Sequence, residues 1–202
     1  MCLYLIQTLV RHTSIRSLTG ACLWGMVSFG IALIIQTRLA GTIFSLNSIH
    51  LISAPLLEEM LKALPLLWFM ARNNRQSTVV YGFAVGLGFA LVESTFYMMT
   101  NPDSAMVTAL ARVISIHLVH SVNTALVGLA ISRWASVRPV VKVLVSTMLV
   151  HSAYNWLVLS LHGNLQMIMA ANVGVGAMIF LMVLISSGDR LALLRVSQLI
   201  SR

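Results

Sequence analysis

The sequence carries a group of ionisable residues inside a stretch that is otherwise apolar. Glu58, Glu59 and Lys62 lie within SAPLLEEMLKALPLLWFM, which runs from Ser53 to Met70. A charged Asp, Lys or Arg near the centre of a bilayer costs about 2.5 to 3.5 kcal/mol on insertion scales, so ions inside apolar segments point to a functional site. Lys62 can pair with one glutamate at a spacing of three or four residues. The other glutamate is then free to take or give a proton.

Three further polar groups lie in other apolar segments. Glu93 follows Gly82, Gly86 and Gly88, whose GxxxG spacing predicts a close approach of helices. His120 shares a helix face with Thr124, and His151 lies one turn before Asn155. Ions that face lipid are costly, so the helices are expected to bring these groups together. We expect one polar cavity to contain Glu58, Glu59, Glu93, His120, His151 and Asn155.

The composition is that of a polytopic membrane protein, because 58% of the 202 residues are hydrophobic and 9% are charged. A helix needs about 20 apolar residues to cross a bilayer. This length predicts six spans, over residues 17–36, 42–71, 78–99, 106–132, 140–161 and 165–187. The second contains two prolines, so we expect a surface piece to about residue 48 and then a kinked span. The expected fold is all-α, a polytopic membrane helix bundle with about six transmembrane helices.

Most of the basic residues lie between or beside the predicted spans, and their distribution predicts the orientation of the chain. If there are six spans, one side receives Arg11, Arg16, Arg72, Arg75, Arg133, Arg138, Lys142, Arg190, Arg195 and Arg202. Arg38 falls on the other side, and Arg112 is expected to reach the outer interface from within its span. Positively charged loops are retained in the cytoplasm, so both termini are expected there. We divide the chain into an interfacial segment (1–16), a transmembrane domain (17–187) and a cytoplasmic amphipathic tail (188–202).

Four motifs on separate spans resemble the PrsW family of intramembrane proteases, which is related to the type II CAAX prenyl-protease and ABI superfamily. The motifs are EExxK, FxxxE, a His followed by TAxxG, and HxxxN. They correspond to Glu58–Lys62, Phe89–Glu93, His120 with Thr124, Ala125 and Gly128, and His151–Asn155. The resemblance covers residues 58–155 and is specific because the four motifs recur in order. It implies a protease-like transmembrane domain.

Peptide hydrolysis in a membrane gives these residue types a chemical reason. A water must be held and deprotonated, and the developing oxyanion needs hydrogen-bond donors. A glutamate can be the base, and analogy with the superfamily favours Glu58 over Glu59. Glu93 or His120 can share the water. Asn155 and a protonated His151 can donate to the oxyanion, an arrangement that the superfamily resemblance also implies.

The same side chains also suit a divalent metal such as zinc, with Glu58, Glu93, His120 and His151 as the candidate ligands. The chain has no HExxH motif, so we place metal-free hydrolysis first. The expected protein is an intramembrane endopeptidase of a bacterial inner membrane. Its expected partners are the lipid bilayer and a membrane-protein or peptide substrate.

Other functions remain open at this point. A small transporter or ion relay also places Glu, His and Lys at mid-membrane. Transporters usually have internal repeats, however, and the EExxK group has no counterpart in the second half of the chain. A third hypothesis is a catalytically inactive membrane scaffold, which the presence of every motif residue disfavours. The net charge of +8 is not gathered in one patch, so we expect no nucleic-acid partner.

Overall fold

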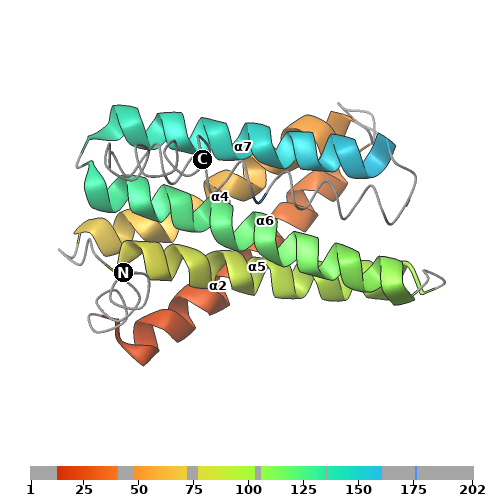
Figure 1. Cartoon of the computed structure of the whole chain (residues 1–202), viewed down its shortest axis with the longest axis horizontal. Coiled ribbons are helices and arrows are strands. Elements are labelled where there is room, and N and C mark those ends of the chain that lie inside the picture. Colours follow the sequence, from red (N-terminus) through yellow and green to blue (C-terminus); the bar gives the residue numbers. More distant parts are fainter. Residues whose placement is uncertain are drawn as a thin grey trace, which may run out of the picture.

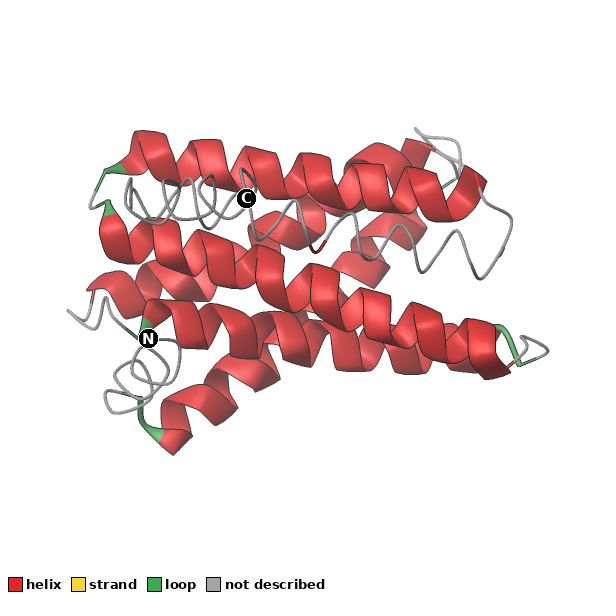
Figure 2. Ribbon diagram, viewed as in Figure 1, coloured by secondary structure: helices red, strands yellow, loops and turns green. Residues whose placement is uncertain are grey.

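The computed structural model describes residues 13–40, 48–71, 77–102, 106–134, 136–160 and 176. Its elements are α2 (Ile15–Leu39), the π-helix η1 (Ile49–Ser53), α4 (Ala54–Ala71), α5 (Thr78–Thr100), α6 (Met106–Arg133) and α7 (Val137–Ser160). Figure 2 shows that these elements are helical throughout. The expected all-α class is therefore confirmed.

Four described helices, α2, α5, α6 and α7, are long and apolar enough to cross a membrane. They lie at the expected spans 17–36, 78–99, 106–132 and 140–161. Helix α4, with 18 residues, occupies the second expected span and contains the three ionisable residues. The sixth expected span, the first twelve residues and the tail 188–202 lie outside the described residues. The structure thus supports a membrane helix bundle without confirming the count of six.

Helix α5 packs against α2 and α6 along much of its length. Figure 1 shows α5 and α6 side by side and antiparallel, with α7 on the other side of α6. Glycines allow these close approaches. A Cβ on Gly86 would collide with the backbone of His120 and Ser121, and one on Gly25 would collide with Val85. The glycine spacing therefore acts as the sequence predicts, by letting helix backbones touch.

A proline inside α4 is compensated by a side chain from α2. Pro65 has no backbone N–H, so the carbonyl of Leu61, four residues earlier, lacks its helical donor. The indole Nε1 of Trp24 donates to this carbonyl at 3.0 Å. An unsatisfied polar group is costly in an apolar environment, so this bond fixes α2 against α4 at the level of the site.

An apolar cluster fills the bundle beside the ionisable groups. It contains Ala21, Ala63, Leu66, Tyr81, Val85, Val127 and Ile131, contributed by α2, α4, α5 and α6. On the other side of α6, Asn123 Nδ2 donates to the carbonyl of Thr147 at 3.3 Å and ties α6 to α7. These contacts hold four helices around α4, which carries Glu58, Glu59 and Lys62.

Candidate active site

The structure brings the ionisable residues of four helices into one cluster. Glu58, Glu59 and Lys62 come from α4, Glu93 from α5, His120 from α6 and His151 from α7. All except Glu93 are buried. Asn155, one turn after His151, lies beside the cluster. All six predicted site residues therefore lie together.

Lys62 lies at the centre of the cluster and contacts both an acid and a base. Its Nζ atom is 2.7 Å from Glu59 Oε1 and 2.7 Å from His120 Nδ1. The same atom lies 4.8 Å from the centroid of the Phe89 ring. A buried ammonium is tolerated only when its charge is compensated, and these three contacts provide that compensation.

The two adjacent glutamates have different surroundings. Glu59 Oε1 is 3.0 Å from His151 Nδ1 and also contacts Lys62, so Glu59 lies behind the histidine. Glu58 Oε1 accepts a hydrogen bond from Gln36 Nε2 at 2.9 Å, and Glu58 Oε2 is 3.8 Å from His151 Nε2. Neither Glu58 Oε2 nor Glu59 Oε2 has a hydrogen-bond partner. Glu58, unlike Glu59, lines a cavity.

Glu93 and His120 form the second half of the cluster. His120 Nε2 is 2.6 Å from Glu93 Oε2, while the other ring nitrogen faces Lys62. The His120 ring lies 4.7 Å from the Phe89 ring and 4.8 Å from the His151 ring, measured between centroids. The close contact of α5 and α6 at Gly86 sets the position of His120 relative to α5.

The π-helix before α4 explains where the amide of Asn155 goes. In a π-helix a carbonyl accepts from the residue five positions later, and for His50 that residue is Pro55, which has no N–H. Asn155 Nδ2 donates to this His50 carbonyl at 2.9 Å. The bond docks α7 onto η1 and holds the Asn155 side chain at the cavity wall.

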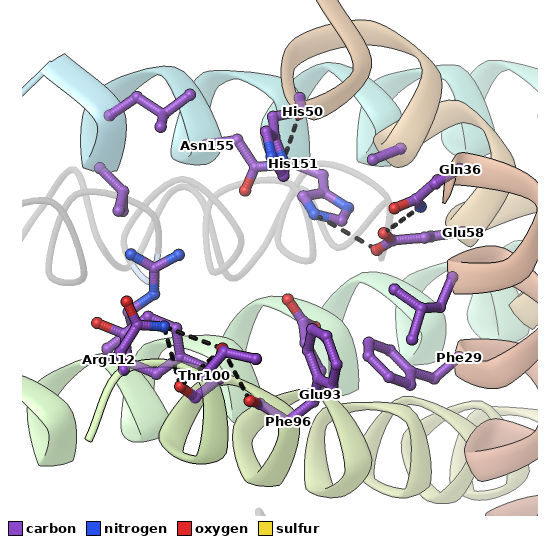
Figure 3. A pocket seen from close by; sticks show the side chains of 16 residues that line it. Phe29, Gln36, His50, Glu58, Glu93, Phe96, Thr100, Arg112, His151 and Asn155 are labelled. Atoms are coloured by element: carbon purple, nitrogen blue, oxygen red, sulfur yellow. Dashed lines mark hydrogen bonds and ion pairs between the residues drawn. The ribbon is translucent and has the colours of Figure 1, made fainter. Parts of the chain in front are cut away.

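A cavity of about 370 Å³ opens beside the cluster. Figure 3 shows Glu58 and His151 on one side of it and Glu93 on the other, with Arg112 farther along. Its walls come from η1 and from each of the five α-helices that the structure describes. His120 and Glu59 are absent from its lining and support the groups that reach it. The cavity therefore exposes two carboxylates and an imidazole to whatever enters.

Sequence reasoning did not place Gln36 or Arg112 in the cavity. Gln36, which donates a hydrogen bond to Glu58, lies at the end of the first apolar span. A single amide side chain in such a span was the one sign in the sequence that Gln36 has a polar partner inside the bundle. Arg112 was expected to reach the outer interface, and the structure shows that its side chain also lines the cavity. The position of each of these two residues along its helix follows from the sequence, but the direction of its side chain depends on how the helix is rotated within the bundle.

The cluster offers a group of donors that fits a divalent metal. One ligand atom each from Glu58, His120 and His151 can be chosen so that all lie within 4.8 Å of one another. Glu58 Oε2 is buried without a hydrogen-bond partner, as expected of an atom that awaits a ligand. Two imidazoles and a carboxylate are common zinc donors, and the Glu59 contact to His151 Nδ1 is typical of the support behind a metal-binding histidine. The residues therefore fit a metal.

Comparison with known proteins agrees with this geometry. Residues 13–185 match the family model described as PrsW family intramembrane metalloprotease. Comparisons with curated proteins and with solved structures each gave no match. The matched residues include every member of the cluster and the helices that carry them. The chain therefore belongs to the PrsW family of intramembrane proteases.

Proposed function

We propose that this membrane protease hydrolyses a peptide bond of a membrane protein or peptide in the cavity between Glu58 and Glu93. The observation that carries the proposal is the wall of this cavity, where the unpartnered Glu58 Oε2 lies 3.8 Å from His151 Nε2 and Glu93 faces them. A water bound there meets both a proton acceptor and a polarising group, as peptide hydrolysis requires.

The surroundings of the two adjacent glutamates support a division of roles. Glu58 reaches the cavity and contacts water or substrate. Glu59 orients His151 through Nδ1 and balances the charge of Lys62, so it acts as a positioning residue. For a metal-free reaction, this division supports the expectation that Glu58, and not Glu59, is the base.

The donor set favours metal-dependent hydrolysis over the metal-free route that the sequence placed first. Glu58, His120 and His151 would hold the ion, and a bound zinc lowers the pKa of a coordinated water and polarises a carbonyl. Both ring nitrogens of His120 are already engaged, Nε2 by Glu93 and Nδ1 by Lys62, so an ion held by either nitrogen would replace one of these contacts. If the contact with Glu93 were the one replaced, the Glu93 carboxylate would be free to accept a proton from water.

Asn155 is suited to stabilise the oxyanion. One of its two N–H groups is used by the His50 carbonyl, and the second remains available at the wall of the cavity. The bond to His50 fixes the side chain, so the donor is placed before the reaction starts. Preorganised donors of this kind stabilise a developing negative charge more than mobile ones do.

The arrangement of the cluster argues against a transport function. Contacts link Glu93, His120, Lys62, Glu59, His151 and Glu58 in one continuous series. Both ends of this series face the same cavity. A proton relay across a membrane needs ends that face opposite sides, whereas a hydrolytic site needs its acidic and basic groups to meet in one place.

Co-expression with a library of tagged single-span membrane proteins tests the proposed function. We expect fragments that are present with the wild type and absent with Glu58→Gln, because glutamine cannot accept the proton or bind a metal as glutamate does. Asp103→Asn, a change of the same type in a predicted loop, is the matched control and should leave the fragments present. An identical fragment pattern for the wild type and Glu58→Gln would contradict the proposal.

A further inference from the structure

We propose that Arg112 forms a subsite that binds a carboxylate of the substrate, so that the enzyme prefers an acidic residue near the cleaved bond. The proposal rests on the proposed cleavage of a peptide in the same cavity and adds a rule for substrate choice. Arg112 lies in the second turn of α6 and lines the cavity that Glu58 and Glu93 share. Figure 3 shows it along the cavity from Glu58, beyond Glu93.

The guanidinium stacks on an aromatic ring and forms no ion pair with a carboxylate of the described residues. Its Cζ atom lies 4.2 Å from the centroid of the Tyr97 ring, a stacking that orients the plane of the group. The Nε atom is buried without a hydrogen-bond partner, and no carboxylate among the described residues forms an ion pair with Arg112. A fixed, unpaired guanidinium is suited to binding a carboxylate through two parallel hydrogen bonds.

Two polar side chains that line the same cavity, Thr100 and Asn101, use their donor groups within the C-terminal end of α5. Thr100 Oγ1 donates to the carbonyls of Phe96 and Tyr97, and Asn101 Nδ2 donates to Tyr97 and to Thr100 Oγ1. Among the lining residues that the structure describes, Arg112 is the one lysine or arginine. This end of the cavity should therefore distinguish a charged acid from the corresponding neutral amide.

Helix geometry sets the distance between this subsite and the cleaved bond. Tyr97, which stacks on Arg112, follows Glu93 by one turn, or about 6 Å along the axis, and Arg112 precedes His120 by about 12 Å. An extended peptide advances about 3.3 Å per residue. The acidic residue should therefore lie about two to four residues from the cleaved bond, on the side directed toward the start of α6.

A peptide fits this distribution of charge better than a lipid does. A ligand that reaches Arg112 shares the cavity with two carboxylates at the other end. A peptide can present an uncharged amide to Glu58 and Glu93 and a single carboxylate to Arg112. An anionic lipid would gain the same contact at Arg112, but its apolar acyl chains would form no favourable contacts with the two carboxylates at the other end of the cavity.

Crosslinking measures the preference independently of hydrolysis. The probes are photoreactive single-span peptides that carry Asp, Asn or Lys at one position at a time. They are incubated with the full chain in phosphatidylcholine nanodiscs. The protein carries Glu58→Gln, so that the peptides are not cleaved. We expect the Asp peptide to crosslink about tenfold more than the Asn peptide at one or two positions, as one charged hydrogen-bonded pair allows. Arg112→Gln should remove this difference, and Arg112→Glu should favour the Lys peptide.

Arg133→Gln is the matched control, since Arg133 also lies on α6 over an aromatic ring, that of Trp134 at 5.7 Å, but does not line the cavity. It should keep the Asp preference.

Equal crosslinking of Asp and Asn peptides at every position in the protein that retains Arg112 would overturn the proposal, whether or not the Arg112 variants fold. It would also be overturned if native mass spectrometry showed phosphatidylglycerol bound through Arg112 without any Asp preference. If the wild type cleaves peptides without an acidic preference, the Arg112 subsite is contradicted and the proposed hydrolysis is not. If Asp peptides are preferred but never cleaved, the proposed hydrolysis is contradicted and the subsite is not.

Discussion

At the scale of single residues, the site depends on a lysine that is completely buried. Lys62 is 0% exposed and contacts Glu59 and His120 at 2.7 Å each. A buried ion pair contributes little net stability when both partners are present, but removal of one partner leaves an uncompensated charge. Lys62 therefore has a structural role in addition to its place beside the reacting groups.

Lys62→Met should destabilise the protein by about 3 to 5 kcal/mol, because the Glu59 carboxylate then remains buried without its cation. Thermal unfolding of the purified protein in detergent measures the effect. Lys142→Met is the matched control, since Lys142 is exposed on α7. Adding Glu59→Gln to Lys62→Met should restore part of the stability. Equal unfolding temperatures for Lys62→Met and the wild type would contradict this account of the cluster.

Metal content tests two of the three proposed ligands, Glu58 and His151, directly. We expect the purified wild type to retain about one zinc ion per chain, as the donor set allows, and Glu58→Gln or His151→Ala to lose it. His117→Ala is a suitable control, because His117 lies one turn before His120 and contacts the carbonyl of Val113 instead of the cluster. Elemental analysis gives the ratio. Equal retention of zinc by the His151→Ala protein would exclude His151 as a ligand.

Part of the site was predictable from the sequence, because charged residues in apolar spans must converge to avoid lipid. The convergence of Glu58, Glu93, His120 and His151 follows from this cost. The choice between Glu58 and Glu59 does not follow from this cost. Adjacent residues on a helix point about 100° apart, so the rotation of α4 decides which of the two reaches the cavity. The direction of Arg112 depends on helix rotation in the same way.

At the scale of the elements, glycines and prolines place the helices that carry these residues. Gly86 brings the α5 backbone against His120, and the carbonyls left by Pro55 and Pro65 accept hydrogen bonds from Asn155 and Trp24. The sequence predicted close helix approach at the glycines. It did not predict the π-helix or the partners of the two free carbonyls, because those partners lie far away in the chain.

Gly86→Ala should separate α5 from α6 and reduce both stability and activity. The new Cβ would overlap the backbone of His120, which cannot move as a flexible side chain can, and overpacking of this kind typically costs about 1 to 3 kcal/mol. Gly30→Ala is the matched control, because nothing lies within 4 Å of a Cβ placed there. Thermal unfolding of both variants gives the comparison. A Gly86→Ala protein as stable as the Gly30→Ala protein would refute the close contact.

At the scale of the whole molecule, the charges lie unevenly between the two ends of the bundle. Arg16, Arg133, Arg138 and Lys142 lie at the end where α2 and α7 begin and α6 ends, which is the left end in Figure 1. The cavity lies toward the other end, near the end of α5 and the start of α6. We infer from the positive-inside rule that the basic end is cytoplasmic and that the cavity opens to the outer side.

Reporter fusions test this orientation. A reporter that is active only in the cytoplasm should be active when fused at Arg202 and inactive when inserted near Asp103, because six spans place these two positions on opposite sides. Finding both positions on the same side would remove the six-span arrangement and the outward-facing cavity together. It would leave the contacts within the cluster unaffected, since these do not depend on orientation.

We propose that the cavity carboxylates activate water to cleave a peptide bond, and cleavage in oxygen-18 water tests this proposal. A substrate found by co-expression is incubated with the purified protein, and mass spectrometry follows the new carboxyl terminus. We predict that the wild type places the label there and that Glu58→Gln and Glu93→Gln lower the rate by about 10² to 10⁴ while remaining folded. Labelled product formed at the wild-type rate by every variant of Glu58, Glu59 and Glu93 would contradict the assignment of hydrolysis to this cavity.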